Sequence, residues 1–215
     1  MYSFLYDFAD RRRQVRHYLA VVSRQERSAG MGTPRVQEAR LLTLRAGTFL
    51  VLYNLIEAST RVAIEAIHDQ ITMNDTPFML LAISLRKEIV RMFKKGADPE
   101  KDHTFDDFPS EFVATALAQG VDFSGNVDAR LIRRIAEIYG FSVAARSLAR
   151  DGADLLTIKT NRNDLSHGRK TFEEVGRDQS TRDLVLLSKR SMSYMSDILE
   201  NIACYLRNRR YLEAP

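Results

Sequence analysis

Phe49–Ile56, with the sequence FLVLYNLI, is apolar around almost the whole circumference of a helix, and only Asn54 interrupts it. A helix that is apolar on all sides has to be enclosed by other elements. The run lies within a longer helical pattern, from about Val36 to Ile71. We therefore expect this segment to be the central buried helix of an all-α protein.

The same periodicity continues outward along the chain, because apolar residues recur at intervals of three and four. The other predicted helices cover about residues 2–28, 77–94, 110–118, 128–139 and 153–167, with a last helix after a capping box at Ser180–Asp183. Residues 96–109 form a predicted polar loop, residues 120–125 a turn, and residues 141–151 give no clear pattern. No alternating run bounded by turn residues indicates a strand, so we predict a single helical bundle over residues 1–215 with long antiparallel helices, short extra helices and no substantial sheet. The last helix is expected to pack antiparallel to the helix at residues 153–167.

Composition supports this class of fold. The chain has only 5 prolines and 10 glycines in 215 residues, and no Pro/Gly/Ser-rich linker divides it. The single cysteine, Cys204, excludes an intrachain disulfide and fits a reducing cytoplasm. Met1–Asp10 lacks the order of a signal peptide, and Phe49–Ile56 is too short to span a bilayer. We expect a cytoplasmic protein without a membrane segment.

The charge of the chain is a weaker indication of function than the helical pattern is of fold. The formal net charge is +4, which permits contact with nucleic acid without demonstrating it. Basic residues cluster at residues 11–16, 130–134, 159–170 and 207–210. Three of these clusters are most simply solvated helix faces, whereas the cluster at residues 159–170 coincides with a sequence that could carry chemistry.

That sequence is Lys159–Gly168, KTNRNDLSHG. On a helix Asn163 and His167 lie one turn apart on the same side, whereas Arg162 projects among the apolar positions. An arginine there needs partners for its donors or a wet cleft. A permanently charged guanidinium can hold a phosphate with two hydrogen bonds, and a histidine can accept and return a proton near neutrality. RNA supplies its own nucleophile, the 2′-hydroxyl, so this set of groups could cleave RNA without a metal.

A structural interpretation stands beside the chemical one. Helices often end in His or Lys before a left-handed glycine, so His167 and Gly168 could simply close the helix. Asn54, Glu57 and Arg61 form a polar strip on the central helix, in which a Glu57–Arg61 ion pair is one interpretation and support of the site by Asn54 or Glu57 the other.

Other kinds of site have little support. Gly-rich phosphate loops, the H-E-x-x-H motif and paired cysteines are absent from the sequence. Asp102, His103, Asp106 and Asp107 share one loop but lack regular ligand spacing, so they are more simply solvated. We therefore expect no metal site and no cofactor.

The run Arg162–His167, RNDLSH, resembles the R-x(4–6)-H signature of the HEPN (higher eukaryotes and prokaryotes nucleotide-binding) superfamily. Its flanks at residues 123–138 and 168–183 resemble the MAE-type prokaryotic branch of that superfamily, as do the pattern Leu50-Tyr53-Asn54-Glu57 and the ending at residues 205–212. The similarity covers most of the chain. It implies a HEPN-like helical bundle.

The resemblance also implies roles for single residues. His167 would be the general acid or base, Arg162 the phosphate clamp, and Asn163 the residue that orients one of them or the RNA. Lys159, Ser166, Arg169 and Lys170 would be RNA-binding neighbours. Related ribonucleases act as homodimers with two motifs facing each other, and they occur in toxin–antitoxin and phage-defence systems, often beside a nucleotidyltransferase-like partner.

Three functions follow as hypotheses. The first is a metal-independent endoribonuclease that acts as a homodimer. The second is a non-catalytic module that binds nucleic acid or nucleotide through Arg162 and Lys159. The third is a helical interaction protein that binds another protein of a defence or antitoxin system through its helical faces.

Overall fold

A computed structural model describes residues 2–27, 33–96, 110–120, 123 and 125–213 of the chain. Within these residues it is all-helical, and the only pairing of β type is an isolated antiparallel bridge between Leu81 and Leu212. The elements are α1 (Ser3–Arg27), α2 (Pro34–Met73), η1 (Phe78–Leu80), α3 (Ile83–Gly96), α4 (Ser110–Leu117), α5 (Ala129–Tyr139), η2 (Ser147–Gly152), α6 (Ala153–Ser166), α7 (Phe172–Arg177) and α8 (Thr181–Arg207). The predicted all-α fold without a substantial sheet is confirmed.

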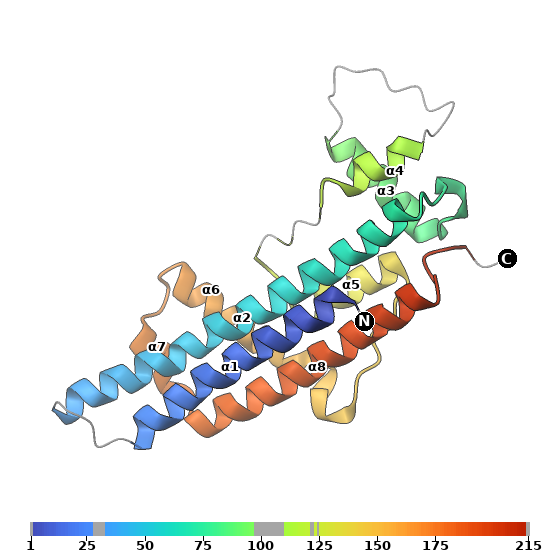
Figure 1. Cartoon of the computed structure of the whole chain (residues 1–215). Coiled ribbons are helices and arrows are strands. Elements are labelled where there is room, and N and C mark those ends of the chain that lie inside the picture. Colours follow the sequence, from blue (N-terminus) through green and yellow to red (C-terminus); the bar gives the residue numbers. More distant parts are fainter. Residues whose placement is uncertain (1, 28–32, 97–109, 121–122, 124, 214–215) are drawn as a thin grey trace.

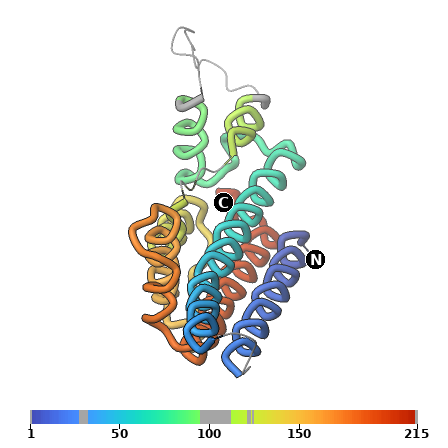
Figure 2. Tube along the Cα trace, turned by 90° about the vertical axis from the view of Figure 1, so that its left-hand side faces the viewer, coloured from blue at the N-terminus to red at the C-terminus, as the bar shows by residue number. Residues whose placement is uncertain are grey.

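Three long helices, α1, α2 and α8, form the body of the bundle (Figure 1). Helix α1 is antiparallel to α2, because Glu26 pairs with Arg45 at one end while Arg11 reaches Asn54 further along. Helices α2 and α8 run in the same direction, since Arg45 bonds to Thr181 near their starts and Asn74 bonds to Tyr211 beyond their ends. Figure 2 shows α6 and α7 on the opposite side of α2 from α1.

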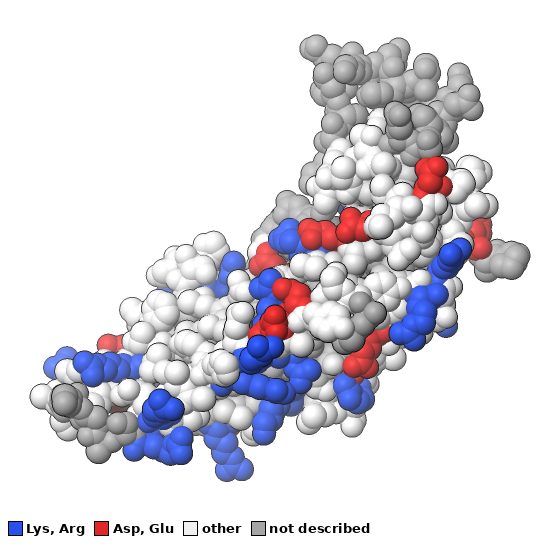
Figure 3. Space-filling view, viewed as in Figure 1, with Lys and Arg blue, Asp and Glu red and all other residues white. Residues whose placement is uncertain are grey.

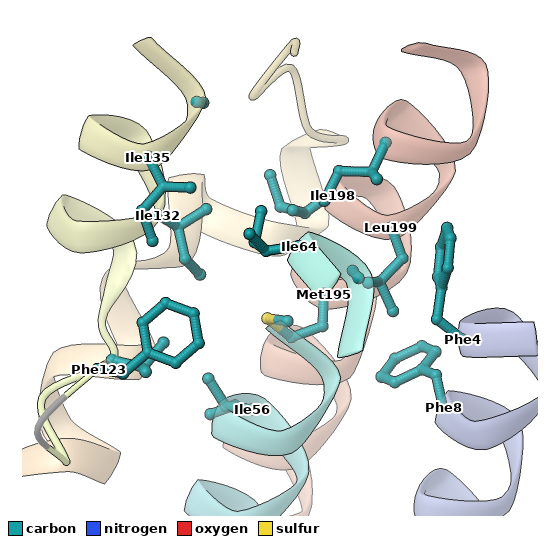
Figure 4. Close-up of a cluster of buried hydrophobic side chains, with 14 of the residues drawn as sticks. Phe4, Phe8, Ile56, Ile64, Phe123, Ile132, Ile135, Met195, Ile198 and Leu199 are labelled. Carbon is teal, nitrogen blue, oxygen red and sulfur yellow. The ribbon is translucent and has the colours of Figure 1, made fainter. Parts of the chain in front are cut away.

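The buried side chains form one continuous cluster in which α2 is central. Ile56 and Ile64 of α2 are fully buried, and they meet Met195 and Ile198 of α8 on one side and the α5 region on another (Figure 4). Phe4 and Phe8 extend the cluster from α1. Burial of these apolar side chains is the main term that stabilises the bundle, at about 1.5–3 kcal/mol for each large side chain.

By length and apolar composition α2 could also cross a membrane, with a mean hydropathy of 1.3 over its most apolar window. Its contacts with α1, α6, α7 and α8 account for that composition as a bundle core. One contact is especially close: a Cβ at Gly176 of α7 would lie 2.0 Å from the Leu42 carbonyl oxygen. Glycine therefore lets α7 rest directly on the backbone of α2.

The structure corrects the prediction of one continuous helix over residues 77–94. The chain forms η1, leaves helical geometry at Leu81 and starts α3 at Ile83. Tertiary bonds cause the break, because the Ala82 N–H donates to the Tyr211 carbonyl and the Glu213 N–H donates to the Leu80 carbonyl. The C-terminal segment thus binds the backbone that local periodicity would assign to a helix.

Two further elements differ from expectation. Helix α7 was not predicted, although Thr171 and Glu174 form a complete capping box at its start. The packing of the last helix along the motif helix is also less extensive than expected: α6 contacts α8 but lies mainly on α2, and the Arg190–Asp154 ion pair links its first turn to α8. Of the predicted loop at residues 96–109, Gly96 is the last residue of α3 and the rest lies outside the described residues.

Candidate active site

Helix α6 is held firmly at its first turn. Asp154 has a side chain only 10% exposed and accepts two hydrogen bonds from Arg190 of α8, at 2.6 and 2.9 Å. Gly152 precedes the helix with φ +74°, and a Cβ there would lie 2.8 Å from the Tyr194 ring and 2.9 Å from Ala129. Leu155 and Ile158 are fully buried. These contacts fix the start and the direction of α6.

Arg162 lies half-buried in the third turn of α6, with its guanidinium over the ring of Tyr53 at 4.5 Å. Its Nη1 donates to the Asn163 side-chain oxygen at 2.9 Å. Gly125 leaves room beside it, since a Cβ there would lie 3.2 Å from Nη1. Among the residues that the structure describes, no carboxylate pairs with Arg162. Within those residues, most of the five donors of the guanidinium are therefore uncommitted.

Tyr53 is itself held in place. Its hydroxyl accepts a hydrogen bond from the Val127 N–H at 3.0 Å. Burial raises the pKa of Tyr53, and the nearby Glu57 carboxylate raises it further, against the lowering effects of the Val127 bond and the Arg162 charge. The ring therefore stays neutral and offers its π-face to the cation, an arrangement worth about 1–2 kcal/mol when partly desolvated.

His167 follows the last residue of α6 and is exposed. Its backbone N–H donates to the Asn163 carbonyl at 3.0 Å, which places it one turn beyond Asn163. Gly168 then takes φ +65°, and the N–H groups of Arg169 and Lys170 bond back to the Asp164 carbonyl. The imidazole has no hydrogen-bond partner in the described part of the chain, so it is accessible to a ligand.

The other histidines provide a contrast. His68 is buried and its Nε2 lies 2.7 Å from the Tyr139 hydroxyl. Burial lowers the pKa of His68 to about 4 despite the opposing effect of nearby acids. His17 is exposed on α1, and His103 lies outside the described residues. Among the described histidines, His167 is thus the exposed one at the end of the helix that carries Arg162.

Lys159, which we predicted to bind RNA, has a carboxylate partner in this structure. It forms an ion pair with Asp128, whose side chain is 8% exposed. Asp128 also caps α5 by accepting the N–H groups of Arg130 and Leu131. Although burial alone would raise the pKa of Asp128, the Lys159 bond and these N–H groups lower it overall. Lys159 therefore neutralises a buried carboxylate and ties α6 to α5.

The remaining predicted RNA-binding residues are exposed around the end of α6. Ser166 and Arg169 are open to solvent, and Arg169 lies at a loose 3.9 Å from Asp164. Lys170 lies 3.7 Å from Asp178. Such weak exposed pairs contribute little to stability, so both cations can reach a bound anion.

The structure separates the two candidate supporting residues. Glu57 pairs with Arg61 at 3.2 Å, and it also influences Tyr53, so it belongs to the shell behind Arg162. Asn54 instead accepts a bond from Arg11 at 3.3 Å and lines a groove between α1 and α2. It lies on the side of α2 that faces α1, away from α6.

Sequence reasoning did not assign Tyr53, Gly125 or Asp128 to the site. Tyr53 had a usable signal, because it is one helical turn before Glu57. Gly125 and Asp128 precede α5 and reach α6 only through the tertiary fold. In the described residues no group of three or more His, Cys, Asp or Glu side chains could hold a metal ion, and the acidic loop with Asp102 and His103 lies outside them.

The fold and the site define a helical-bundle protein with an arginine and a histidine at one helical end. A family model for MAE_28990-like HEPN proteins matches residues 3–211, so the chain belongs to the HEPN superfamily, in its MAE-type branch. No curated protein and no solved structure matches the chain significantly.

Proposed function

We propose that this protein is a metal-independent endoribonuclease whose reaction centre is the C-terminal end of α6. The observation that carries the proposal is that Arg162 pairs with no carboxylate among the described residues and lies on the same helix that ends at the exposed His167. A half-buried arginine without a carboxylate is costly unless it serves an anionic ligand. Membership of the HEPN superfamily supports the same function.

The proposed reaction is a transesterification within RNA. A base removes the proton of a ribose 2′-hydroxyl, and the 2′ oxygen attacks the adjacent phosphorus. The bond from phosphorus to the 5′ oxygen of the next nucleotide breaks, and an acid gives that oxygen a proton. The products are a 2′,3′-cyclic phosphate and a 5′-hydroxyl. Arg162 would hold the non-bridging oxygens, whose negative charge grows in the transition state.

The reaction benefits from one base and one acid, whereas each chain offers one exposed histidine beside the motif arginine. A homodimer with its two-fold axis near the end of α6 would supply a second His167 and a second Arg162. We therefore include a homodimer in the proposal. Analytical ultracentrifugation is expected to give twice the mass of the chain, and a monomer that cleaves RNA would contradict this part.

A partner that covers the end of α6 would switch the enzyme off. The exposed residues Ser166, His167 and Arg169 form the entrance that such a partner has to close. An antitoxin or a nucleotidyltransferase-like protein of a toxin–antitoxin or phage-defence system is the kind of partner that we propose. Protection of His167 from alkylation in the complex would test it.

The decisive test compares wild type, His167→Ala and His17→Ala for RNA cleavage in excess EDTA. His17 is the matched control because it is an exposed histidine on a different helix. Wild type and His17→Ala are expected to cleave, and His167→Ala is expected to lose at least about 100-fold in rate. Loss of wild-type activity in EDTA, or full activity of His167→Ala, would overturn the proposal. RNA that binds but stays intact would favour the binding module instead.

A further inference from the structure

A second site is indicated on the other side of the bundle, in a groove between α1 and α8. The groove has a volume of about 660 Å³, and the segment with Arg146 and Leu148 closes one of its sides. Its size is typical of sites for small ligands. Helix α1 lies on the opposite side of α2 from α6 and α7, so this groove is separate from the end of α6 (Figure 2).

Among the described residues, four cationic side chains and one acidic side chain line this groove. The cations are Arg12, Arg16, Arg146 and Lys189, and the acid is Glu200. Arg146 already pairs with Asp197 at 2.6 Å, although its own side chain is 65% exposed. Within the described chain, Arg12, Arg16 and Lys189 have no ion-pair partner. Figure 3 shows basic side chains gathered along α1.

Arg12 is the most constrained of these cations. Its guanidinium lies over the Phe8 ring at 5.5 Å, and its Nε is buried with no hydrogen-bond partner among the described residues. The pKa of Arg12 is lowered by burial first and then by the like charges of Arg16 and Arg146, which the Glu200 charge only partly opposes. Three guanidiniums therefore act on one another at one end of the groove. Such an arrangement is stabilised when a multivalent anion binds there.

The rest of the groove is apolar. Leu19 and Met192 form part of its floor, and Val185 lies towards the end of the groove marked by Ser23. Leu148 is 60% exposed beside them, which is unusual for a leucine on a basic surface. A ligand that suits both parts carries concentrated negative charge at one end and an apolar or flat organic group at the other.

We propose that the groove between α1 and α8 binds a small phosphate ester, with its phosphate groups on Arg12, Arg16 and Arg146 and its organic part on Leu148 and Met192. The guanidinium fork matches a phosphate through two parallel hydrogen bonds. Lys189 reaches the bound molecule from the α8 side. This site is independent of RNA cleavage at α6.

The distribution of charge favours this ligand class over an acidic peptide or an RNA strand. A peptide helix needs basic groups along both rims, whereas three of the four cations here converge at one end. An RNA strand needs a basic track that continues beyond one small groove. Glu200 and the apolar floor interrupt such a track.

Calorimetric titration of the whole protein tests the proposal, with ATP, pyrophosphate, adenosine and a hexaglutamate peptide as probes. ATP is expected to bind more tightly than pyrophosphate, and adenosine and hexaglutamate at least about tenfold more weakly than ATP. Arg16→Glu is expected to weaken ATP binding at least about tenfold. The matched control is Arg24→Glu, which makes the same charge change on an exposed part of α1 that does not line the groove. The control is expected to stay within about twofold of wild type.

A second variant tests whether the organic part of the ligand binds against Leu148. Leu148 is exposed, so Leu148→Ser leaves the fold intact. This variant is expected to weaken ATP several-fold while pyrophosphate binding stays unchanged. The proposal is overturned if neither phosphate probe binds, if Arg24→Glu weakens ATP as much as Arg16→Glu, or if hexaglutamate binds more tightly than ATP. His167→Ala is expected to bind ATP like wild type, which separates this test from that of the nuclease.

Discussion

An arginine lies at each end of α6, but the two ends differ in how the surrounding residues neutralise its charge. At the first turn the buried Asp154 accepts two hydrogen bonds from Arg190. Gly152, which has no Cβ, lets Tyr194 and Ala129 pack closely against the start of the helix. Towards the other end, the partners of Arg162 among the described residues are an aromatic ring and a neutral amide, and His167 is open to solvent. The first end satisfies its charges within the protein. The second leaves charge available for a ligand, which is what a catalytic site requires.

Arg162→Lys should have the largest effect. Lysine keeps the positive charge but loses the planar fork, so RNA cleavage is expected to fall about 100-fold or more. The melting temperature should stay within about 2 °C of wild type, because the native guanidinium makes no ion pair with the described residues that would be lost. Cleavage rates and thermal melts of Arg162→Lys provide the measurement.

The matched control for this variant is Arg169→Lys, which makes the same substitution at an exposed cation near the same helix end. It is expected to retain activity within about threefold of wild type. Equal losses in both variants would contradict a distinct role for the Arg162 guanidinium, and full activity of Arg162→Lys would show that only positive charge matters at this end.

A buried histidine gives the contrasting pH response. The folded pKa of His68 is about 4, below its ordinary value of 6.5. Between these values the unfolded chain binds a proton that the folded chain does not, so acidification lowers the free energy of unfolding. The expected loss is on the order of 2–3 kcal/mol from pH 6.5 to pH 4, and this group contributes almost no slope above about pH 8. Denaturant titrations across this range measure it.

His68→Gln should flatten that slope, while His17→Gln on the exposed face of α1 should leave it as in wild type. A slope that stays unchanged in His68→Gln would mean that another group causes the acid sensitivity. Burial of His68 would then not be what makes the fold sensitive to acid.

Asp154→Asn should destabilise the first turn of α6. The substitution leaves Arg190 without its charged partner, and the free energy of unfolding is expected to fall by about 2 kcal/mol, or about 4–8 °C in melting temperature. Cleavage per folded molecule should not change. Asp10→Asn serves as the control, because its pair with Arg13 is exposed on both sides and is worth less than about 1 kcal/mol. A large activity loss in folded Asp154→Asn would remove the division between the two ends.

Asn54→Ala should have the smallest effect. Asn54 bonds to Arg11 on the α1 side of α2, so cleavage is expected to stay within about twofold and stability within about 0.5 kcal/mol of wild type. A loss of cleavage as large as that of Arg162→Lys would contradict the placement of Asn54 outside the site.

Periodicity predicted the helices well where the local pattern and the tertiary contacts agree. The central helix, the capped helix α5 and the motif helix follow from apolar spacing, Asp128, Gly140 and Gly168. The break at Leu81 could not be predicted, because it depends on bonds to Tyr211 and Glu213 more than 100 residues away in sequence. Helix α7 was missed although its capping box is visible in the sequence, because six residues give too little periodicity.

The site was predicted in part for the same reason. The motif placed Arg162, Asn163 and His167 at one helix end, which the structure agrees with. The motif could not show that Lys159 pairs with Asp128, or that Tyr53 supports the arginine. Those relations depend on how α6 rests against α2 and α5. The local sequence therefore indicated which chemical groups form the site. The tertiary fold determines that Lys159 pairs with a carboxylate, whereas Arg162 pairs with none among the described residues.

The most direct measurement of the central claim uses one RNA oligonucleotide and its copy with a single 2′-deoxy nucleotide at the cut position, both in excess EDTA. Wild-type protein is expected to cleave the all-ribose strand into fragments with a 2′,3′-cyclic phosphate and a 5′-hydroxyl, identified by mass spectrometry. The 2′-deoxy strand should resist at that position. Cleavage of the 2′-deoxy strand there, or cleavage of the RNA only when metal is added, would contradict the account.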